Sequence, residues 1–412
     1  MKKLFISLGL IFILLLLFNC DNQATQPADG PEEYPVRDLN ALEKQVVQAD
    51  NQFGLKLFRQ INAAENDKNS FISPLSISMA LGMTWNGAGG ATRDSMQAVL
   101  ELAGLTPAQV NESYQSLIAL LLNLDPNVQM EIANSIWYRN SLNFEPNFIQ
   151  LNQTYFNAQV TGLDFTANNA ASIINQWVSE HTHARIQQIV EAPINPLTIM
   201  FLINAIYFKG TWTYQFDPNL TQPAEFSNAD GSKSSVQMMN QSTDFHYFST
   251  SQFQAIDLPY GRKKFRMAVV LPNSDVDINQ LISQLTAEKW LEWVGSFAKQ
   301  PGSLALPKFT FEYEIELKKA LSALGMGIAF SDVADFTNMY AGGGIYINKV
   351  KHKSFVEVNE EGTKAAAVTS VEMRFTSVGG NFQMLVDRPF MFIIYENHSQ
   401  TILFIGKITN LG

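Results

Sequence analysis

The stretch that decides the fold lies near the C-terminal end and reads Val356-Glu357-Val358-Asn359-Glu360-Glu361-Gly362-Thr363-Lys364-Ala365-Ala366-Ala367-Val368-Thr369-Ser370-Val371-Glu372-Met373-Arg374-Phe375-Thr376-Ser377. From Phe355 to Val358 the chain alternates apolar and polar residues, as a half-buried strand does. Glu360-Glu361-Gly362 then interrupts the pattern with two charges and a residue whose backbone is permissive. We expect a turn or an exit from a sheet at this point.

The residues after Gly362 are small and keep a period of two, which is the period of an extended chain. One face of that chain would carry Thr363, Ala365, Ala367, Thr369, Val371, Met373 and Phe375. The pattern is that of a central strand, although the stretch opens with charges that belong at a surface. A helix is the alternative, because Lys-Ala-Ala-Ala has high helix propensity and Thr363 could cap it.

Residues 360–369 resemble the hinge of the serpins, the serine-protease-inhibitor family, which reads E-E-G-T-x-A-A-A-x-T. The hinge residues here are Glu360, Glu361, Gly362, Thr363, Lys364, Ala365, Ala366, Ala367, Val368 and Thr369. Four other segments are similar to family signatures and follow in the family's order: Asn69 to Ser78, Asn204 to Trp212, Leu306 to Phe309 and Asp387 to Phe390. The resemblance implies an α+β serpin fold, with about nine helices around three β-sheets and an exposed reactive-centre loop.

The resemblance also implies a mechanism. In serpins a protease attacks the exposed loop and forms an acyl-enzyme, and the freed hinge inserts as a new central strand of the largest sheet. Such a strand needs small or apolar inward residues and no proline, because a central strand donates alternate N–H groups to its neighbours. Thr363, Ala365 and Ala367 meet this need, and no proline lies between Gly362 and Asp387. We expect an active inhibitor and no enzyme; a serpin-fold protein that binds without trapping is the alternative.

Two groups of residues would control this insertion. The resemblance assigns a shutter, a polar network under the point where the sheet parts, to Ser73, Ser76, Asn204 and His352. It assigns the breach, the entrance at the top of the sheet, to Trp212, Lys308 and Glu360, the last two as an ion pair. A buried polar cluster is stable only when its donors are paired, so it can hold a sheet closed.

The family's spacing from the hinge points to Thr376-Ser377 as the bond that the protease cleaves, which suits an elastase-like enzyme. Phe375 would suit a chymotrypsin-like protease and Arg374 a trypsin-like one. The segment between the hinge and Pro389 is somewhat longer than is usual, so these neighbouring bonds stay alternatives. We expect broad specificity toward serine proteases and extend the expectation to cysteine proteases.

The composition excludes several other classes of protein. With 38 acidic and 28 basic residues the net charge is −10, which argues against a nucleic-acid surface. No G-x-S-x-G, H-E-x-x-H, P-loop or G-x-G-x-x-G motif is present. We interpret Ser296 and Lys299, which fit S-x-x-K, as a helix end, and His181 and His183 as a solvated pair without a carboxylate partner. We expect no catalytic residue, metal or cofactor, and a monomer.

The N-terminal residues predict export. Residues 1–19 have the basic start and short apolar run of a signal peptide, here of the lipoprotein type. The sequence before Cys20 resembles a bacterial lipobox with lipid on Cys20, although Asn19 departs from the usual small residue; ordinary signal cleavage and a retained anchor are alternatives. Residues 20–38 are polar and would form a flexible tether, and residues 39–412 a single serpin domain. We expect a lipid-anchored protein on the periplasmic or surface face of a bacterial membrane.

The hydrophobic pattern predicts individual elements as well. A long helix should run from about Leu42 to Ile61, and further helices should begin at Ser73-Pro74, Thr92 and Thr106-Pro107 and cover about 170–184. Alternation predicts a strand from Val128 to Tyr138, and the apolar run 198–208 a strand covered on both faces. The β-rich runs 265–271, 390–395 and 402–408 should join one compact sheet.

Overall fold

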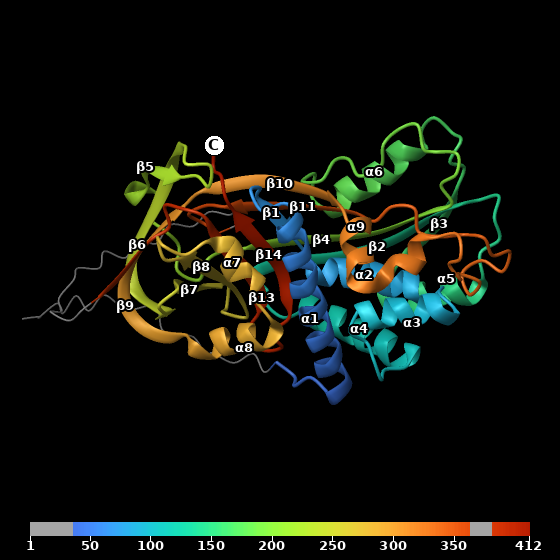
Figure 1. Cartoon of the computed structure of the whole chain (residues 1–412), viewed down its shortest axis with the longest axis horizontal. Helices are drawn as coiled ribbons and strands as arrows, with labels where there is room; N and C mark the ends of the chain where they lie inside the picture. The colour runs from blue at the N-terminus through green and yellow to red at the C-terminus, as the bar shows by residue number, and fades with distance from the viewer. Residues whose placement is uncertain (1–35, 363–380) are drawn as a thin grey trace, which may run out of the picture. The chain divides into compact units, whose positions relative to one another are not determined.

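The sheets determine the architecture of the part of the chain that this computed structural model describes, residues 36–362 and 381–412. From Arg37 onward the chain forms one compact unit. Its nine-stranded sheet has the order β1-β14-β13-β8-β7-β6-β9-β12, and β5 pairs with β6. The other described strands form a three-stranded sheet, β3-β2-β4, and a two-stranded sheet, β10-β11. Figure 1 shows β11 between β10 and β4, so the two smaller sheets lie edge to edge.

The strands have the following bounds: β1 Ser70–Ile72, β2 Val128–Arg139, β3 Gln159–Leu163, β4 Met200–Gly210, β5 Gln222–Ser227, β6 Lys233–Ser249, β7 Phe253–Tyr260, β8 Phe265–Pro272, β9 Ala298–Pro307, β10 Phe309–Glu316, β11 Lys351–Val358, β12 Phe382–Leu385, β13 Phe390–Glu396 and β14 Ile402–Ile408. The three β-rich runs predicted near the C-terminus and in the middle of the chain are β8, β13 and β14. They are fully buried neighbours in the nine-stranded sheet, which confirms their assignment to one sheet.

The described residues contain nine α-helices: α1 Ala41–Ala64, α2 Pro74–Trp85, α3 Gly90–Val99, α4 Pro107–Leu122, α5 Pro146–Phe156, α6 Ala170–His181, α7 Ile278–Ser283, α8 Ala287–Ser296 and α9 Lys318–Leu321. Two predicted starts are confirmed. The Ser73 hydroxyl caps α2, and Thr106 forms a capping box with Gln109 at the start of α4. The predicted start at Thr92 is wrong, because α3 begins at Gly90 and the buried Thr92 hydroxyl accepts a hydrogen bond from the Asp335 N–H instead.

The prediction that residues 198–208 are covered on both faces is also wrong in part. Strand β4 begins at Met200, and most of its residues are half-buried. Among the described strands, β4 pairs only with β2. Its other edge therefore forms no ladder with a neighbouring strand. Incomplete burial follows from this free edge.

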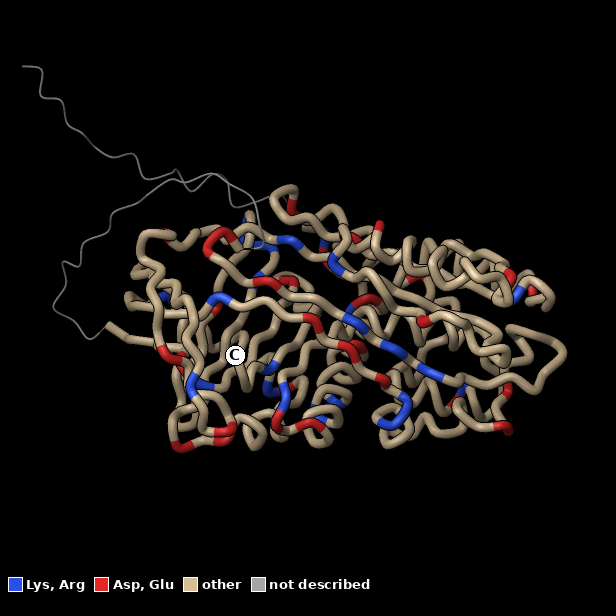
Figure 2. Tube along the Cα trace, turned by 90° about the horizontal axis from the view of Figure 1, so that it is seen from above, with Lys and Arg blue, Asp and Glu red and all other residues tan. Residues whose placement is uncertain are grey.

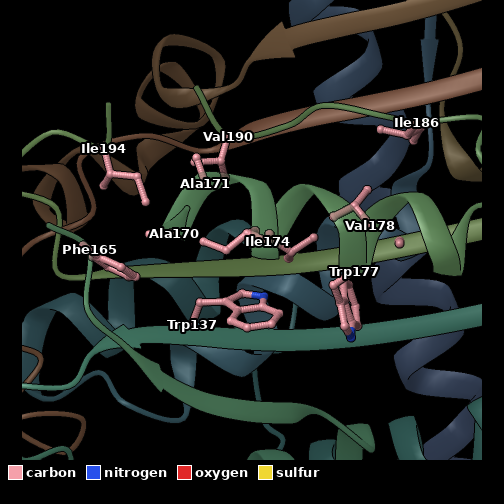
Figure 3. Packing of buried hydrophobic residues seen from close by; sticks show 12 residues of the cluster. Trp137, Phe165, Ala170, Ala171, Ile174, Trp177, Val178, Ile186, Val190 and Ile194 are labelled. Carbon is pink, nitrogen blue, oxygen red and sulfur yellow. The ribbon is translucent and has the colours of Figure 1, made fainter. Parts of the chain in front are cut away.

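Helix α6 covers the outer face of the three-stranded sheet. Its apolar side packs on β2 and β4 through one cluster of buried residues: Trp137, Phe165, Ala170, Ala171, Ile174, Trp177, Val178, Ile186, Val190, Ile194, Ile203 and Ala205. Figure 3 shows that Ile186, Val190 and Ile194 come from the segment after α6, which runs back along the helix. Burial of this kind contributes about 1.5–3 kcal/mol for each large aliphatic side chain, so the helix and the returning segment are firmly attached to this sheet.

Candidate functional site

The candidate site is the opening between β4 and β11. Paired strands lie about 4.7–4.9 Å apart, whereas almost every Cα atom of β4 is more than 8 Å from every Cα atom of β11. Among the described residues, an isolated β-bridge between Thr211 and Gly362 joins the two sheets just beyond the C-terminal ends of both strands. A separation of this kind is too large for a direct ladder between β4 and β11.

Four walls enclose the upper part of this opening. Strand β4 lines one side with residues 206–208, and β11 lines the other with residues 355–358. Thr182, Arg185 and Ile186 lie at the front, and apolar side chains of the nine-stranded sheet lie behind, including Phe71, Met267, Ile394 and Phe404. The cavity that these residues line has a volume of about 30 Å³. The walls are mainly apolar, which suits small apolar side chains.

Strand β11 turns back on itself at the upper end of the opening. Asn359 and Gly362 exchange two main-chain hydrogen bonds of 3.2 Å, which close a tight turn. Gly362 has a φ of 109°, and a Cβ atom there would lie 2.3 Å from the Gly210 carbonyl oxygen and 2.6 Å from the Trp212 nitrogen. Glycine is required here both for the backbone angle and for the close approach. The sequence prediction of a turn or exit at this position is confirmed.

Trp212 holds this turn against the end of β4. Its backbone N–H donates to the Glu361 carbonyl at 2.9 Å, and its indole Nε1–H donates to the Asn359 carbonyl at 2.9 Å. The indole stacks on Tyr260, with ring centroids 4.2 Å apart and an interplanar angle of 13°. The predicted breach residue therefore touches both the hinge and the nine-stranded sheet.

Glu360 and Lys308 form the predicted ion pair at the same entrance, with 2.8 Å between Lys308 Nζ and Glu360 Oε2. The Thr221 hydroxyl also donates to Glu360, over 2.8 Å. Burial by itself would raise the pKa of Glu360, but the hydrogen bonds from Lys308 and Thr221 hold the pKa below its ordinary value. The carboxylate is thus fixed in its charged form beside the hinge.

The four predicted shutter residues lie together under the lower part of β4 and β11, and a hydrogen bond of 3.3 Å from the Ser76 N–H to Ser73 Oγ joins their contacts with the two strands. The Ser73 N–H donates to His352 Nε2 at 3.1 Å, which links α2 to β11. The Ser76 hydroxyl donates to the Asn204 carbonyl at 3.5 Å, which links α2 to β4. The Asn204 side-chain Nδ2 donates to Asn134 Oδ1 at 2.6 Å, while its buried Oδ1 has no partner among the described residues. These hydrogen bonds therefore reach both sides of the opening through the first turn of α2.

Sequence reasoning missed three contributors to this site. Asn134 bonds the Asn204 amide and donates to the Phe156 carbonyl at 2.7 Å, Tyr260 stacks on Trp212, and Thr221 holds Glu360. Asn134 had a detectable signal, because it is a polar residue on the apolar face of an alternating strand. The other two become neighbours of the site only through the tertiary fold.

Several predicted residues lie outside the described part of the chain. They are the hinge residues from Thr363 to Thr369, the candidate cleavage residues Arg374, Phe375, Thr376 and Ser377, and the candidate lipidation residue Cys20. Residues 36–38 of the predicted tether are described and precede α1.

The interpretation of the two histidines near α6 needs a correction. His183 Nε2 lies 2.8 Å from Glu131 Oε1, so it does have a carboxylate partner, which β2 supplies from a distant part of the sequence. His181 stacks on Trp177 at 4.2 Å. No group of three or more potential metal ligands occurs among the residues that the structure describes. Ser296 ends α8, as predicted. In the same described residues, no helix is long and apolar enough to cross a membrane.

The fold is the serpin fold, an α+β architecture. The family model described as "Serpin (serine protease inhibitor)" matches residues 48–411, and the chain belongs to this family. It is 33% identical over 367 residues to neuroserpin of Gallus gallus, covering 87% of this chain and 90% of that protein. It is 33% identical over 371 residues to serpin B8 of Homo sapiens, covering 88% of this chain and 98% of that protein.

Solved structures of other serpins share the architecture. The thermophilic serpin Tengpin in its native state superimposes with a TM-score of 0.82 at 30% identity, over 91% of this chain and 96% of that chain. Human thyroxine-binding globulin in complex with thyroxine gives a TM-score of 0.82 at 26% identity, over 90% of this chain and 100% of that chain. The fold thus occurs both in protease inhibitors and in a protein that binds a small molecule.

Proposed function

We propose that this protein is a suicide inhibitor of serine proteases that traps its target by inserting its own cleaved loop between β4 and β11. The observation that carries the proposal is the opening itself. The facing edges of β4 and β11 make no ladder with each other, which leaves room for a further strand, and Gly362 lies at the upper end of the opening. A chain entering there would run antiparallel to both neighbours and give each of their free edges a ladder partner.

The protease carries out the chemical steps, and the inhibitor acts only afterwards, when its cleaved loop moves. The protease serine attacks the scissile carbonyl of the loop, the peptide bond breaks, and the acyl-enzyme forms as the new amino terminus leaves. Insertion of the acylated segment then drags the protease along before water can release it. Each main-chain hydrogen bond gained contributes about 0.5–1.5 kcal/mol net. A strand of about a dozen residues therefore gains an amount comparable with the 5–15 kcal/mol stability of a whole domain.

The hinge sequence favours trapping over simple binding. Its inward positions Thr363, Ala365 and Ala367 are small, and no proline follows before Asp387. These residues fit a narrow apolar opening, whereas a charged inward residue would be buried without a partner. The alternative is a non-inhibitory serpin that only binds its partner, which the experiment below distinguishes.

The partner class follows from the loop sequence. Cleavage after Thr376 suits elastase-like serine proteases first, and cleavage after Phe375 or Arg374 suits chymotrypsin-like or trypsin-like ones. Cysteine proteases are included because they form the same kind of acyl-enzyme. We further propose that the protein acts as an exported monomer attached by lipid on Cys20 to a bacterial membrane, with residues 20–38 as the tether.

The test is an SDS-stable adduct. The protein is incubated with elastase, chymotrypsin, trypsin and a papain-like protease, and each mixture is analysed on a denaturing gel and by mass spectrometry of the cleaved loop. We expect a covalent adduct with at least one serine protease. Cleavage of the loop by all of them without any adduct would leave only the binding alternative.

A pair of matched variants separates insertion from cleavage. Thr363→Arg puts a charge on the predicted inward face, so the loop should still be cut but the adduct should be lost. Ala366→Arg puts the same charge on the predicted outward face and should leave most of the adduct. Equal adduct yields from the two variants would show that the inward face is assigned wrongly.

A further inference from the structure

A second hollow lies beside the nine-stranded sheet, where the turn between β6 and β7 faces helices α7 and α8. Its volume is about 180 Å³. An apolar cavity of about 150 Å³ is large enough for benzene, so one six-membered ring fits this space. None of the residues that line the hollow also lines the opening between β4 and β11. The hollow is therefore separate from the place where a strand would insert.

The floor of the hollow is apolar and largely aromatic. Phe253, Leu281 and Trp293 line it, and each is at most 8% exposed. The Phe253 and Trp293 ring centroids are 4.7 Å apart, with an interplanar angle of 54°. Aromatic rings attract one another in tilted or offset arrangements at centroid distances of about 4.5–7 Å. A flat apolar ring is therefore the ligand group that suits this floor best.

The wall that β6 and β7 supply is fixed by hydrogen bonds. The Thr250 hydroxyl accepts hydrogen bonds from the Gln252 and Phe253 N–H groups at 3.0 and 3.2 Å. Asn273 donates from its side chain to the Ser251 carbonyl at 3.0 Å and from its backbone to the Gln252 carbonyl at 2.8 Å. Because the wall is already in place, a ligand would not have to order a loop before it binds.

The rim carries one positive and one negative side chain from the same helix. Lys289 and Glu292 of α8 both line the hollow. They are three positions apart, which places their Cβ atoms about 5–6 Å apart on one face of the helix. Within the described part of the chain neither forms an ion pair, and the contact of the Lys289 amine is a hydrogen bond of 3.5 Å to Gln284. Both charges are thus available to a ligand.

Neighbouring charges of opposite sign are common in this protein, as Figure 2 shows along much of the chain trace. Lys289 and Glu292 differ from an ordinary surface pair because they stand at the edge of a hollow with an aromatic floor. The combination of a ring-sized space and two opposite charges narrows the chemistry of the ligand.

We propose that this hollow binds a small zwitterion that carries an aromatic ring, the chemical class of the free aromatic amino acids. The ring would rest on Phe253 and Trp293. The ligand carboxylate would meet the Lys289 ammonium, and the ligand ammonium would meet the Glu292 carboxylate. An α-amino acid holds its two charges on one carbon atom, which matches two charged side chains on one helix face. A ligand with one charge would leave one rim side chain unmatched. This inference goes beyond the proposed function and does not depend on it.

NMR of the tryptophan indole N–H groups tests the proposal in the full chain. The protein has six tryptophans, and Trp293→Phe identifies the Trp293 signal in protein with ¹⁵N-labelled tryptophan. L-Phenylalanine should shift the Trp293 signal saturably and more than it shifts the signals of the other tryptophans. L-Alanine has the same two charges but no ring and should cause no saturable shift. The inference is overturned if phenylalanine causes no saturable shift, or if alanine binds equally well.

Two ligands with a single charge assign the rim residues. Phenethylamine lacks the carboxylate, and phenylacetate lacks the amine. Lys289→Gln should weaken the binding of phenylalanine about 3- to 10-fold but should not weaken phenethylamine. Glu292→Gln should likewise weaken phenylalanine but not phenylacetate. The pairing of charges is wrong if Lys289→Gln weakens phenethylamine as much as phenylalanine, or if either variant binds phenylalanine as the wild type does.

Protease trapping by the same variants keeps this inference apart from the proposed function. Lys289 and Glu292 do not line the opening between β4 and β11, so both variants should form the protease adduct as the wild type does. A missing adduct in the wild type would count against the proposed function, whereas the titrations with phenylalanine and its analogues alone decide the ligand.

Discussion

The Ser73 N–H donates to His352 Nε2 over 3.1 Å, so that a helix cap and a strand edge far apart in sequence share one buried hydrogen bond. Ser73 also caps α2 through its hydroxyl. Burial lowers the pKa of His352 to about 4, so at neutral pH the ring is neutral and Nε2 is free to accept. The bond requires this uncharged imidazole, because a protonated ring has no acceptor.

His352 therefore makes the protein sensitive to acid. Its pKa is about 4 when folded and ordinarily 6.5, so the unfolded chain takes up the proton first as the pH falls. The stabilisation is complete above pH 6.5 and is lost between pH 6.5 and 4, by about 3 kcal/mol. His352→Gln should remove this part of the pH dependence in urea unfolding, while His398→Gln, at a half-exposed site, should keep it. If the free energies of unfolding of wild type and His352→Gln change in parallel with pH, the assignment of this pH dependence to His352 is wrong.

Asp50 gives a pH effect of opposite sign. Burial raises its pKa to about 7; the Tyr114 hydroxyl donates to Oδ1 at 2.7 Å, while Oδ2 has no partner among the described residues. Because the folded pKa lies above the ordinary 3.8, stability is highest below that pH and falls as the pH rises through 7. Asp50→Asn should stabilise the protein above pH 7 by up to about 4 kcal/mol and have little effect at pH 4. Exposed Asp94→Asn is the control, and no gain from Asp50→Asn at pH 8 would contradict the prediction.

The sequence predicted those parts of the site that local patterns specify. The alternation of β11, the turn before Gly362 and the cap at Ser73 follow from neighbouring residues, and all are present. The pairing of Lys308 with Glu360 required the family resemblance, since 52 positions separate them. The opening between β4 and β11 could not be predicted from the residues, because both strands read as ordinary sheet members and only the tertiary arrangement leaves their facing edges without a ladder.

Gly362→Ala tests the close approach at the breach. A methyl group there would lie 2.3 Å from the Gly210 carbonyl oxygen. The alanine would also have to keep a φ of 109°, in the left-handed region that favours glycine. Gly231→Ala is a matched control, since its φ is 84° but nothing lies within 4 Å of the added Cβ. The control should cost about 1 kcal/mol of unfolding free energy, and Gly362→Ala should cost about 1–3 kcal/mol more. Equal losses of unfolding free energy in the two variants, measured by urea unfolding, would show that the turn is not in close contact with the end of β4.

The melting temperature of the nicked chain tests whether the cleaved loop can insert between β4 and β11 and stabilise the protein. Insertion would add a ladder on each side of the new strand, and a gain of about 5 kcal/mol or more corresponds to a rise of at least about 6 °C in a chain of this size. We expect that rise in differential scanning calorimetry after limited proteolysis of the loop. Thr363→Arg, nicked in the same way, should melt close to its uncut form, because its inward charge cannot be buried without a partner. If nicked and uncut wild type melt together, the opening between β4 and β11 does not accept the loop, and trapping by insertion is excluded.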